Sequence, residues 1–247
     1  MSLPEVAIRD EWLVARQELL RQEKELTRRR DALNAERRRL PMVEITEDYV
    51  FTGPDGEATL LDLFEGHRQL ILGHFMFDPE WDDGCPSCSA GADEVSQGLL
   101  DHLHARDTTL AYVSRAPLEK LERWKAKKGW DFRWYSSHGS HFNYDFHVTL
   151  DDSVAPIEYN YRTAAEHAEA GTDVFVTREQ PMEMPGTSYF LRDGDRVFHT
   201  YSSYARGAEA TGGSYYWLDL TALGRQEDWE EPKGRAESAH AARPVFS

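Results

Sequence analysis

The pattern of hydrophobic and polar positions divides the chain into three parts. From about Pro4 to Leu40 runs one long helical pattern rich in Glu, Arg, Leu and Gln, and Pro41 ends it because proline cannot continue a helix. Apolar residues recur there every seven positions, at Trp12, Leu19, Leu26, Leu33 and Leu40, whereas the second seam of a coiled coil is thin, with Ala15, Gln22 and Arg29. Two interpretations stay open: an amphipathic helix laid across its own domain, and an arm for homodimerisation.

The middle of the chain alternates strand and helix patterns. Residues 49–60 predict a hairpin that turns at Gly53–Gly56, with a helical turn after it at Leu60–Phe64. Residues 69–77 are a near-continuous apolar run, typical of a central strand covered on both faces. After Cys85, the steps of three and four residues predict one face of a single helix, formed by Cys88, Ala92, Val95, Leu99 and Leu103.

Further strands alternate with helices beyond that point. Residues 108–115 predict a strand, Leu118 to Trp124 mark a helix that Gly129 stops, and residues 131–136 predict a third strand. Strand–helix–strand alternation favours an α/β fold with parallel neighbouring strands. Residues 187–202 predict an antiparallel hairpin around Asp193–Gly194.

The charge of the chain argues against a nucleic-acid partner. Residues 1–40 hold 10 Lys and Arg against 8 Asp and Glu, and the remaining residues hold 18 against 36, within a formal net charge of −16. A domain with so large a negative charge repels the phosphate backbone of a nucleic acid. The arginine runs Arg28–Arg30 and Arg37–Arg39 lie among glutamates and are typical of a solvated helix face.

Compartment bears directly on the chemistry of the cysteines. No apolar stretch reaches the roughly 18 residues of a membrane span, and the start of the chain lacks the apolar region of a signal peptide. We therefore expect a cytoplasmic protein that does not bind membranes. A close cysteine pair in that compartment is more often catalytic or metal-binding than a structural disulfide.

The chain has two cysteines, Cys85 and Cys88, in the sequence GCPSC. Pro86 follows Cys85 directly, and proline is favoured at the first helical position, so Cys85 is the predicted N-cap of the helix. Backbone N–H groups and the helix dipole lower the pKa of a thiol there, while Cys88 is predicted to be shielded one turn inside. Negative charge from Asp78, Glu80, Asp82 and Asp83 would raise that pKa, and we expect the backbone contribution to prevail.

Several motifs resemble one bacterial family. The stretches HFMF, WDDGCPSCS, SRAPLEKL, KKGWDFRWYSS, FNYDF and FHTYSSYARG are similar to the bacterial thioredoxin-like proteins catalogued as domain of unknown function 899. The resemblance implies a thioredoxin-like α/β fold, with a central mixed sheet flanked by helices and an added long N-terminal helix. It also implies a dithiol–disulfide oxidoreductase or isomerase role. We expect no cofactor, and a protein or small-molecule disulfide or thiol as substrate. We divide the chain into a helical extension (1–40), a thioredoxin-like domain (41–223) and a poorly ordered tail (224–247).

The sequence departs from thioredoxins around the cysteines. The spacer is Pro86–Ser87, and Trp81 lies four residues upstream instead of directly before the motif. Pro185 stands near the position of the superfamily's cis-proline, with Gly186 between it and the hairpin. We expect Trp81, Pro86 and Pro185 to border a groove for substrate. Asp82 stands where peroxiredoxins carry threonine, which weakens a peroxidase interpretation.

Two alternatives to redox chemistry remain open. Cys85 and Cys88 with His138 and His141 could form a Cys₂His₂ zinc site, if the loop of the histidines folds onto the cysteine helix. A binding or scaffold protein could also use the fold without redox turnover. Other candidates are weaker: His74 is predicted to be a core histidine, Trp130 and Trp134 to be packing residues, and Ser136, Ser137 and Ser140 with the FNYD run to form a substrate-facing loop.

Overall fold

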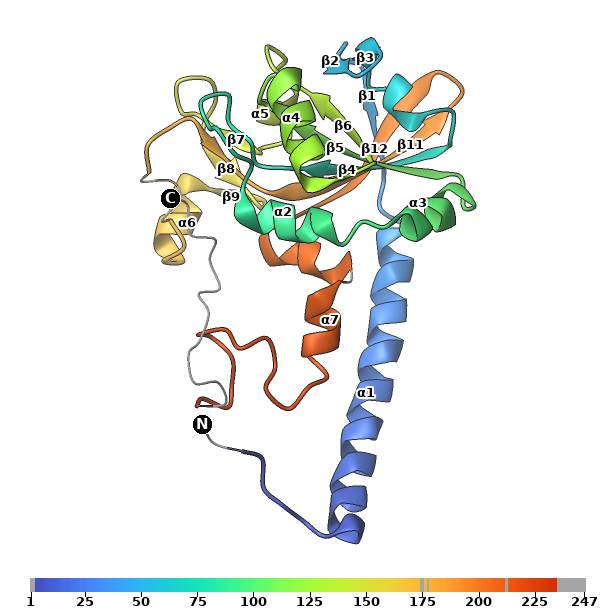
Figure 1. The fold of residues 1–247 in the computed structure, drawn as a ribbon, viewed down its shortest axis with the longest axis vertical. Helices are drawn as coiled ribbons and strands as arrows, with labels where there is room; N and C mark the ends of the chain where they lie inside the picture. Colours follow the sequence, from blue (N-terminus) through green and yellow to red (C-terminus); the bar gives the residue numbers. More distant parts are fainter. Residues whose placement is uncertain (1–2, 174–175, 177, 212, 235–247) are drawn as a thin grey trace. The chain divides into compact units, whose positions relative to one another are not determined.

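The structure is a computed structural model that describes residues 3–173, 176, 178–211 and 213–234 (Figure 1). The chain separates into two compact units. One contains the described residues of Met1–Pro41 and Tyr215–Arg243, and the other contains those of Met42–Ser214. Part of the predicted tail, residues 235–247, lies outside the described residues.

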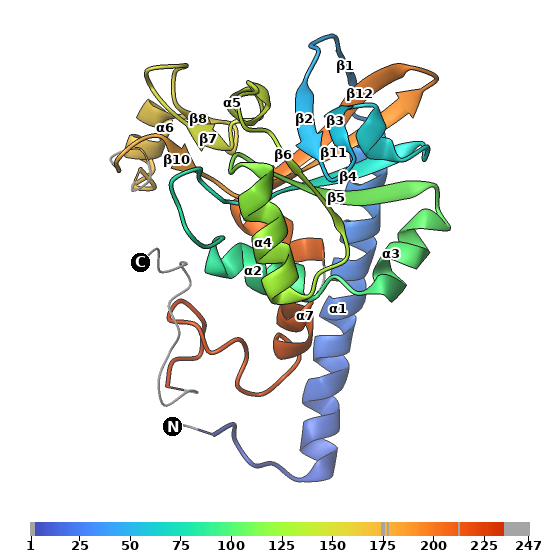
Figure 2. The ribbon, with the colours of Figure 1, turned by 45° about the horizontal axis from the view of Figure 1, so that its top comes forward.

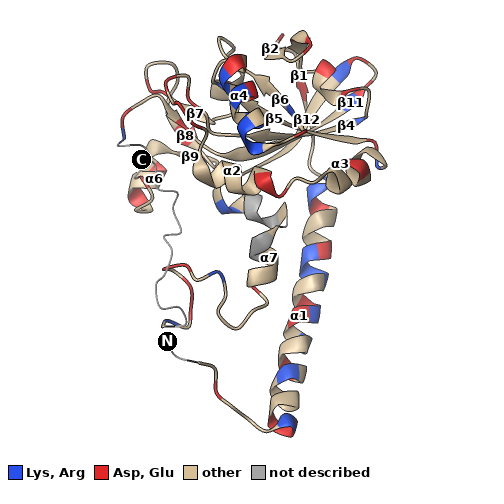
Figure 3. Ribbon diagram, viewed as in Figure 1, with Lys and Arg blue, Asp and Glu red and all other residues tan. Residues whose placement is uncertain are grey.

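The first unit is dominated by the predicted N-terminal helix, α1 (Arg9–Arg37), which has no buried residue. Acidic and basic residues are interspersed along its ribbon (Figure 3), and their side chains form ion pairs such as Arg21–Glu18 at 2.8 Å. The apolar residues spaced by seven remain exposed, from 47% at Trp12 to 58% at Leu33. The unit also contains most of the short helix α7 (Ser214–Leu218). Within the described residues, no helix is both long and apolar enough to cross a membrane.

The second unit is built on an eight-stranded mixed sheet with the order β1-β12-β11-β4-β5-β6-β2-β3. Strands β4, β5 and β6 are parallel to one another, and the other pairings are antiparallel. The strands are β1 (Val43–Ile45), β2 (Val50–Gly53), β3 (Gly56–Thr59), β4 (Gln69–His74), β5 (Thr108–Ser114), β6 (Arg133–Ser136), β11 (Gly186–Asp193) and β12 (Arg196–Tyr204).

Helices and short strands complete this unit. The helices are η1 (Asp62–Phe64), α2 (Pro86–Asp93), α3 (Gln97–His104), α4 (Leu118–Lys128), α5 (Phe142–Asp145), α6 (Ala164–Glu169) and η2 (Ala205–Thr211). Two small sheets pair β7 (Thr149–Leu150) with β10 (Met182–Glu183), and β8 (Glu158–Tyr159) with β9 (Arg162–Thr163).

The strand order confirms the predicted thioredoxin-like fold. The chain passes from β4 through α2 and α3 to the parallel neighbour β5, and later returns as the antiparallel hairpin β11–β12 on the other side of β4. This gives the order β12-β11-β4-β5, and the two cysteines lie at the start of α2, the first helix after the central strand β4. Figures 1 and 2 show α2 and α3 along one side of the sheet.

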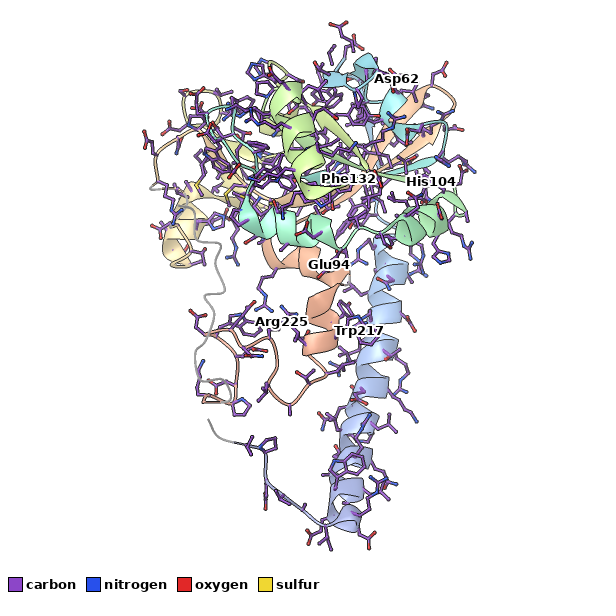
Figure 4. The ribbon with its side chains drawn as sticks, in the orientation of Figure 1. Asp62, Glu94, His104, Phe132, Trp217 and Arg225 are labelled. Carbon is purple, nitrogen blue, oxygen red and sulfur yellow. The ribbon has the colours of Figure 1, made fainter. Side chains whose placement is uncertain are left out.

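Two hydrophobic clusters pack on the two faces of the sheet, because a strand alternates its side chains between its faces. Strand β5 contributes Ala111 and Val113 to the first cluster, and Leu110 and Tyr112 pack against the second. The first contains Leu70 and Leu72 of β4, with Phe64 of η1 and Phe142 of α5. The second contains Phe75 with side chains of α2, α3 and α4, and it holds Phe132, which Figure 4 labels among these packed residues. Burial on both faces explains why residues 69–77 read as one apolar run, although β4 itself ends at His74.

The single helix predicted after Cys85 is wrong, because the chain forms two helices there. The first, α2, ends at Asp93, and α3 begins at Gln97 with Ser96 as its N-cap. The Ser96 hydroxyl accepts the amide of Leu99 at 3.2 Å, and this bond offers the backbone an alternative to a continuous helix. Leu99 is consequently 42% exposed instead of facing the core.

Candidate functional site

Cys85 occupies the predicted N-cap position of α2, and Pro86 stands at the start of the helix. The backbone of Cys85 is anchored on both sides: its amide donates to the Met76 carbonyl at 3.1 Å, and its carbonyl accepts the amide of Ser89 at 2.9 Å. The motif is therefore fixed directly at the carboxyl end of β4, where ligand sites form in open α/β sheets.

The exposure of Cys85 differs from the expected one, because Cys85 is only 1% exposed. Cys88 is half-buried as a residue, and a hydrogen bond to Cys85 and burial of its thiol raise its pKa, as expected for the shielded cysteine. The reason for the burial of Cys85 lies in the approach to the helix: a Cβ at Gly84 would stand 2.8 Å from the Phe75 ring and 3.0 Å from the Trp124 indole nitrogen. Because glycine lets the chain pass this close to the second hydrophobic cluster, the residue after it is buried as well.

The thiols are 3.6 Å apart, and they shift each other's pKa in opposite directions. The hydrogen bond from the Cys88 thiol, with backbone N–H groups of Cys88 and Ser87, lowers the pKa of Cys85 to about 7, although burial acts against this. The bond to Cys85 and burial raise the pKa of Cys88. Among these influences on the pKa of Cys85, the hydrogen bond from the Cys88 thiol is the largest.

The carboxylates of the approach loop do not crowd the Cys85 sulfur. Asp78 is buried and forms an ion pair with Arg115, while Asp83 is exposed and pairs with Lys127 at 3.4 Å. Asp82 and Glu80 are exposed to solvent, where their charge is screened. The expected rise in the pKa of Cys85 from these groups is therefore small beside the effect of Cys88.

Of the residues predicted to border a groove, Pro185 lies beside the carboxyl end of β4, near the motif. Gly186 pairs with His74, the last residue of β4, so Pro185 precedes the register pair nearest the cysteines. Cis peptide bonds precede Pro181 and Pro232 in the described residues, and the bond before Pro185 is not among them. Trp81 is half-buried and packs against the second hydrophobic cluster, and Pro86 is exposed.

The sequence pattern does not predict a buried polar cluster that lies near Pro185. The Arg115 guanidinium, at the end of β5, binds both Asp78 and Glu183, the latter at 2.6 Å. Glu183 is 1% exposed, and Thr149 donates to it at 3.0 Å. Burial raises the pKa of Glu183 to about 7, against the effect of Arg115. The sequence signal was present, since Arg115 ends a predicted parallel strand, but its partners are 37 and 68 residues away.

The zinc set is not assembled. Among the described residues no group of three or more His, Cys, Asp or Glu side chains could hold a metal ion, so Cys85 and Cys88 are not brought together with His138 and His141. The His138 amide binds the Ser136 hydroxyl, and the His141 ring packs 6.1 Å from that of Tyr144.

The other polar candidates are structural. His74 is a core histidine as predicted, with Nε2 hydrogen-bonded to the Ser188 hydroxyl at 2.8 Å, and burial lowers its pKa to about 3. Trp130 and Trp134 are buried in the second cluster, also as predicted. The loop predicted to face substrate is mainly internal, because Ser136 and Ser137 are buried and donate to main-chain carbonyls.

Comparisons with known proteins give one family. The family described as "Bacterial protein of unknown function (DUF899)" matches residues 1–242. No curated protein matches the chain.

Solved structures with the same general architecture are distant in sequence. A cysteine-to-serine mutant of Xanthomonas campestris Peroxiredoxin Q is 13% identical, with 69% of this chain and 91% of that chain covered and a TM-score of 0.44. A putative thiol:disulfide interchange protein DsbE from Chlorobium tepidum is 12% identical, with 70% and 92% covered and a TM-score of 0.37. The fold assignment rests on the strand order described above.

Proposed function

We propose that this chain, which belongs to the bacterial family of unknown function DUF899, is a thiol–disulfide oxidoreductase of the cytoplasm. The observation that carries the proposal is the juxtaposition of two thiols 3.6 Å apart at the start of α2, one favouring the thiolate and the other the thiol. Closing a disulfide bond of about 2.05 Å from there needs only a small side-chain movement.

The chemistry follows from the two pKa shifts. The Cys85 thiolate attacks one sulfur of a substrate disulfide, which forms a mixed disulfide and releases the other sulfur as a thiolate. Cys88 then loses its proton to that leaving thiolate or to water, and attacks Cys85. The Cys85–Cys88 bond forms, the second substrate thiol leaves, and the protein has lost the two electrons that the substrate gained.

Replacing each cysteine by serine tests this order of events. Cys85→Ser removes the thiolate that begins exchange, so it should trap no partner in cells. Cys88→Ser keeps the nucleophile but cannot resolve the mixed disulfide, so covalent adducts should accumulate and be released by a reductant. Non-reducing electrophoresis with mass spectrometry measures both, and the double variant is the matched control.

Equal trapping by both single variants, or none under oxidising stress, would contradict the proposed mechanism. The fold would then serve as a binding scaffold. A reduction potential for the Cys85–Cys88 couple separates the directions of electron flow: a value near about −270 mV indicates a reductase, and one near about −120 mV an oxidant.

A further inference from the structure

The chain's own residues surround the carboxyl end of β4, beside the cysteines. The Cys85 amide binds Met76, two residues beyond His74, and His74 pairs with Gly186 of β11. Cys85 and Pro185 therefore border the same short stretch of backbone. A protein disulfide that binds beside both residues meets the main-chain groups of this stretch.

Two main-chain groups of this stretch are already satisfied. An extended protein segment docks through free main-chain N–H and C=O groups. Here the Met184 amide donates to the Val148 carbonyl at 2.8 Å, where β10 continues its pairing with β7. Pro185 has no N–H, and its carbonyl accepts the Tyr159 hydroxyl at 2.9 Å. An incoming segment therefore has no free Met184 N–H and no free Pro185 carbonyl to which it could form a hydrogen bond.

Tyr159 holds this position firmly. It is 3% exposed, and its hydroxyl also accepts the amide of Ala205 at 3.0 Å, so the phenol links Pro185 to the segment after β12. Its ring packs against Tyr204 with the centroids 5.5 Å apart. Burial raises the pKa of Tyr159.

We propose that the Cys85–Cys88 dithiol acts on low-molecular-weight disulfides and excludes disulfides of folded proteins, with Tyr159 as a specificity-determining residue. The inference rests on the proposed function. A small disulfide needs no main-chain pairing, and it requires a smaller opening beside a cysteine that is 1% exposed. One small disulfide is reduced to two thiols as the dithiol becomes the Cys85–Cys88 disulfide.

The test compares two oxidants on the reduced full-length protein. The rate of thiol loss is measured with bis(2-hydroxyethyl) disulfide and with insulin as the protein disulfide. We expect the wild type to react with the small disulfide at least tenfold faster. Tyr159→Phe, which frees the Pro185 carbonyl, and Tyr159→Ala, which also removes the ring, should raise the insulin rate progressively and change the small-disulfide rate much less.

Tyr161→Ala is the matched control. Tyr161 is 66% exposed, and its hydroxyl binds the Ser202 carbonyl instead of Pro185, so its loss should leave the selectivity ratio unchanged. Circular dichroism verifies that each variant is folded. If Tyr159→Ala is unfolded, the wild-type ratio and Tyr159→Phe decide the test.

Each outcome has a distinct meaning. Comparable wild-type rates with insulin and the small disulfide, or equal ratios in Tyr159→Phe and wild type, overturn the inference while the redox function stands. Thiols that react with neither oxidant, together with a Cys88→Ser variant that forms no mixed disulfide, overturn the proposed function and the inference with it.

Discussion

Among single residues, Cys85 is the group whose ionisation matters most. Its pKa of about 7 predicts that the reduced protein gains thiolate ultraviolet absorbance with a midpoint near pH 7, and that Cys85→Ser loses this transition. Cys88→Ala should move the midpoint upward, because the Cys88 thiol no longer donates to the thiolate. Since folding lowers this pKa, the thiolate stabilises the folded protein at alkaline pH, and that contribution is lost as the pH falls through about 7.

A midpoint at the value of a free cysteine, about 8.5, would show that the thiol pair does not activate Cys85. Pro86→Ala is the control, because Pro86 is exposed and donates no hydrogen bond to either sulfur. Its midpoint should match that of the wild type.

The residues that could be predicted are those fixed by local rules. Cys85 as N-cap follows from Pro86, and the end of α4 follows from Gly129, whose φ of 71° suits glycine. The burial of Cys85 and the ion pairs of Arg115 depend on side chains brought together by the fold, over separations that no local pattern encodes. The sequence could therefore identify the thiols but not their access.

At the scale of elements, the break between α2 and α3 depends on one cap. Ser96→Ala removes the acceptor for the Leu99 amide and should lower the free energy of unfolding by about 1 kcal/mol, the usual cost of losing an N-cap. Chemical denaturation measures the change. Ser96→Asp, which can cap as well as serine, should retain most of the stability. Equal losses in both variants would contradict the assigned role.

Element types were easier to predict than element ends. The β11–β12 hairpin forms around Asp193–Gly194, and the β2–β3 hairpin closes at Gly53–Gly56, because these turn residues act locally. The helix after Cys85 was mispredicted since its apolar spacing continues through Val95 to Leu99, across the break. The Ser96 cap, and not the apolar spacing, decides where the second helix begins.

At the scale of the whole molecule, the alternation of strands and helices was enough to predict a sheet with parallel neighbours. The position of β11 beside β4 could not be predicted from the hydrophobic pattern, because Gln69 and Leu191 pair across more than half of the domain's length. It follows from the strand order of the thioredoxin-like fold. Assembly is also a property of this scale, and α1 is the element that bears on it.

The exposed stripe on α1 predicts a homodimer. Leu19, Leu26 and Leu33 are 51%, 57% and 58% exposed, and their spacing of seven residues keeps them on one face of a supercoiled pair of helices. Replacing all three by glutamine in the full-length chain should halve the mass measured by light scattering, and deletion of residues 1–40 should do the same. Val14→Gln is the control, because Val14 is 70% exposed and lies off the stripe. A wild-type protein that is monomeric at high concentration would contradict this prediction. The heptad spacing would then belong to a solvated helix, on which polar residues such as Arg16 and Glu23, paired at 2.8 Å, interact within one chain.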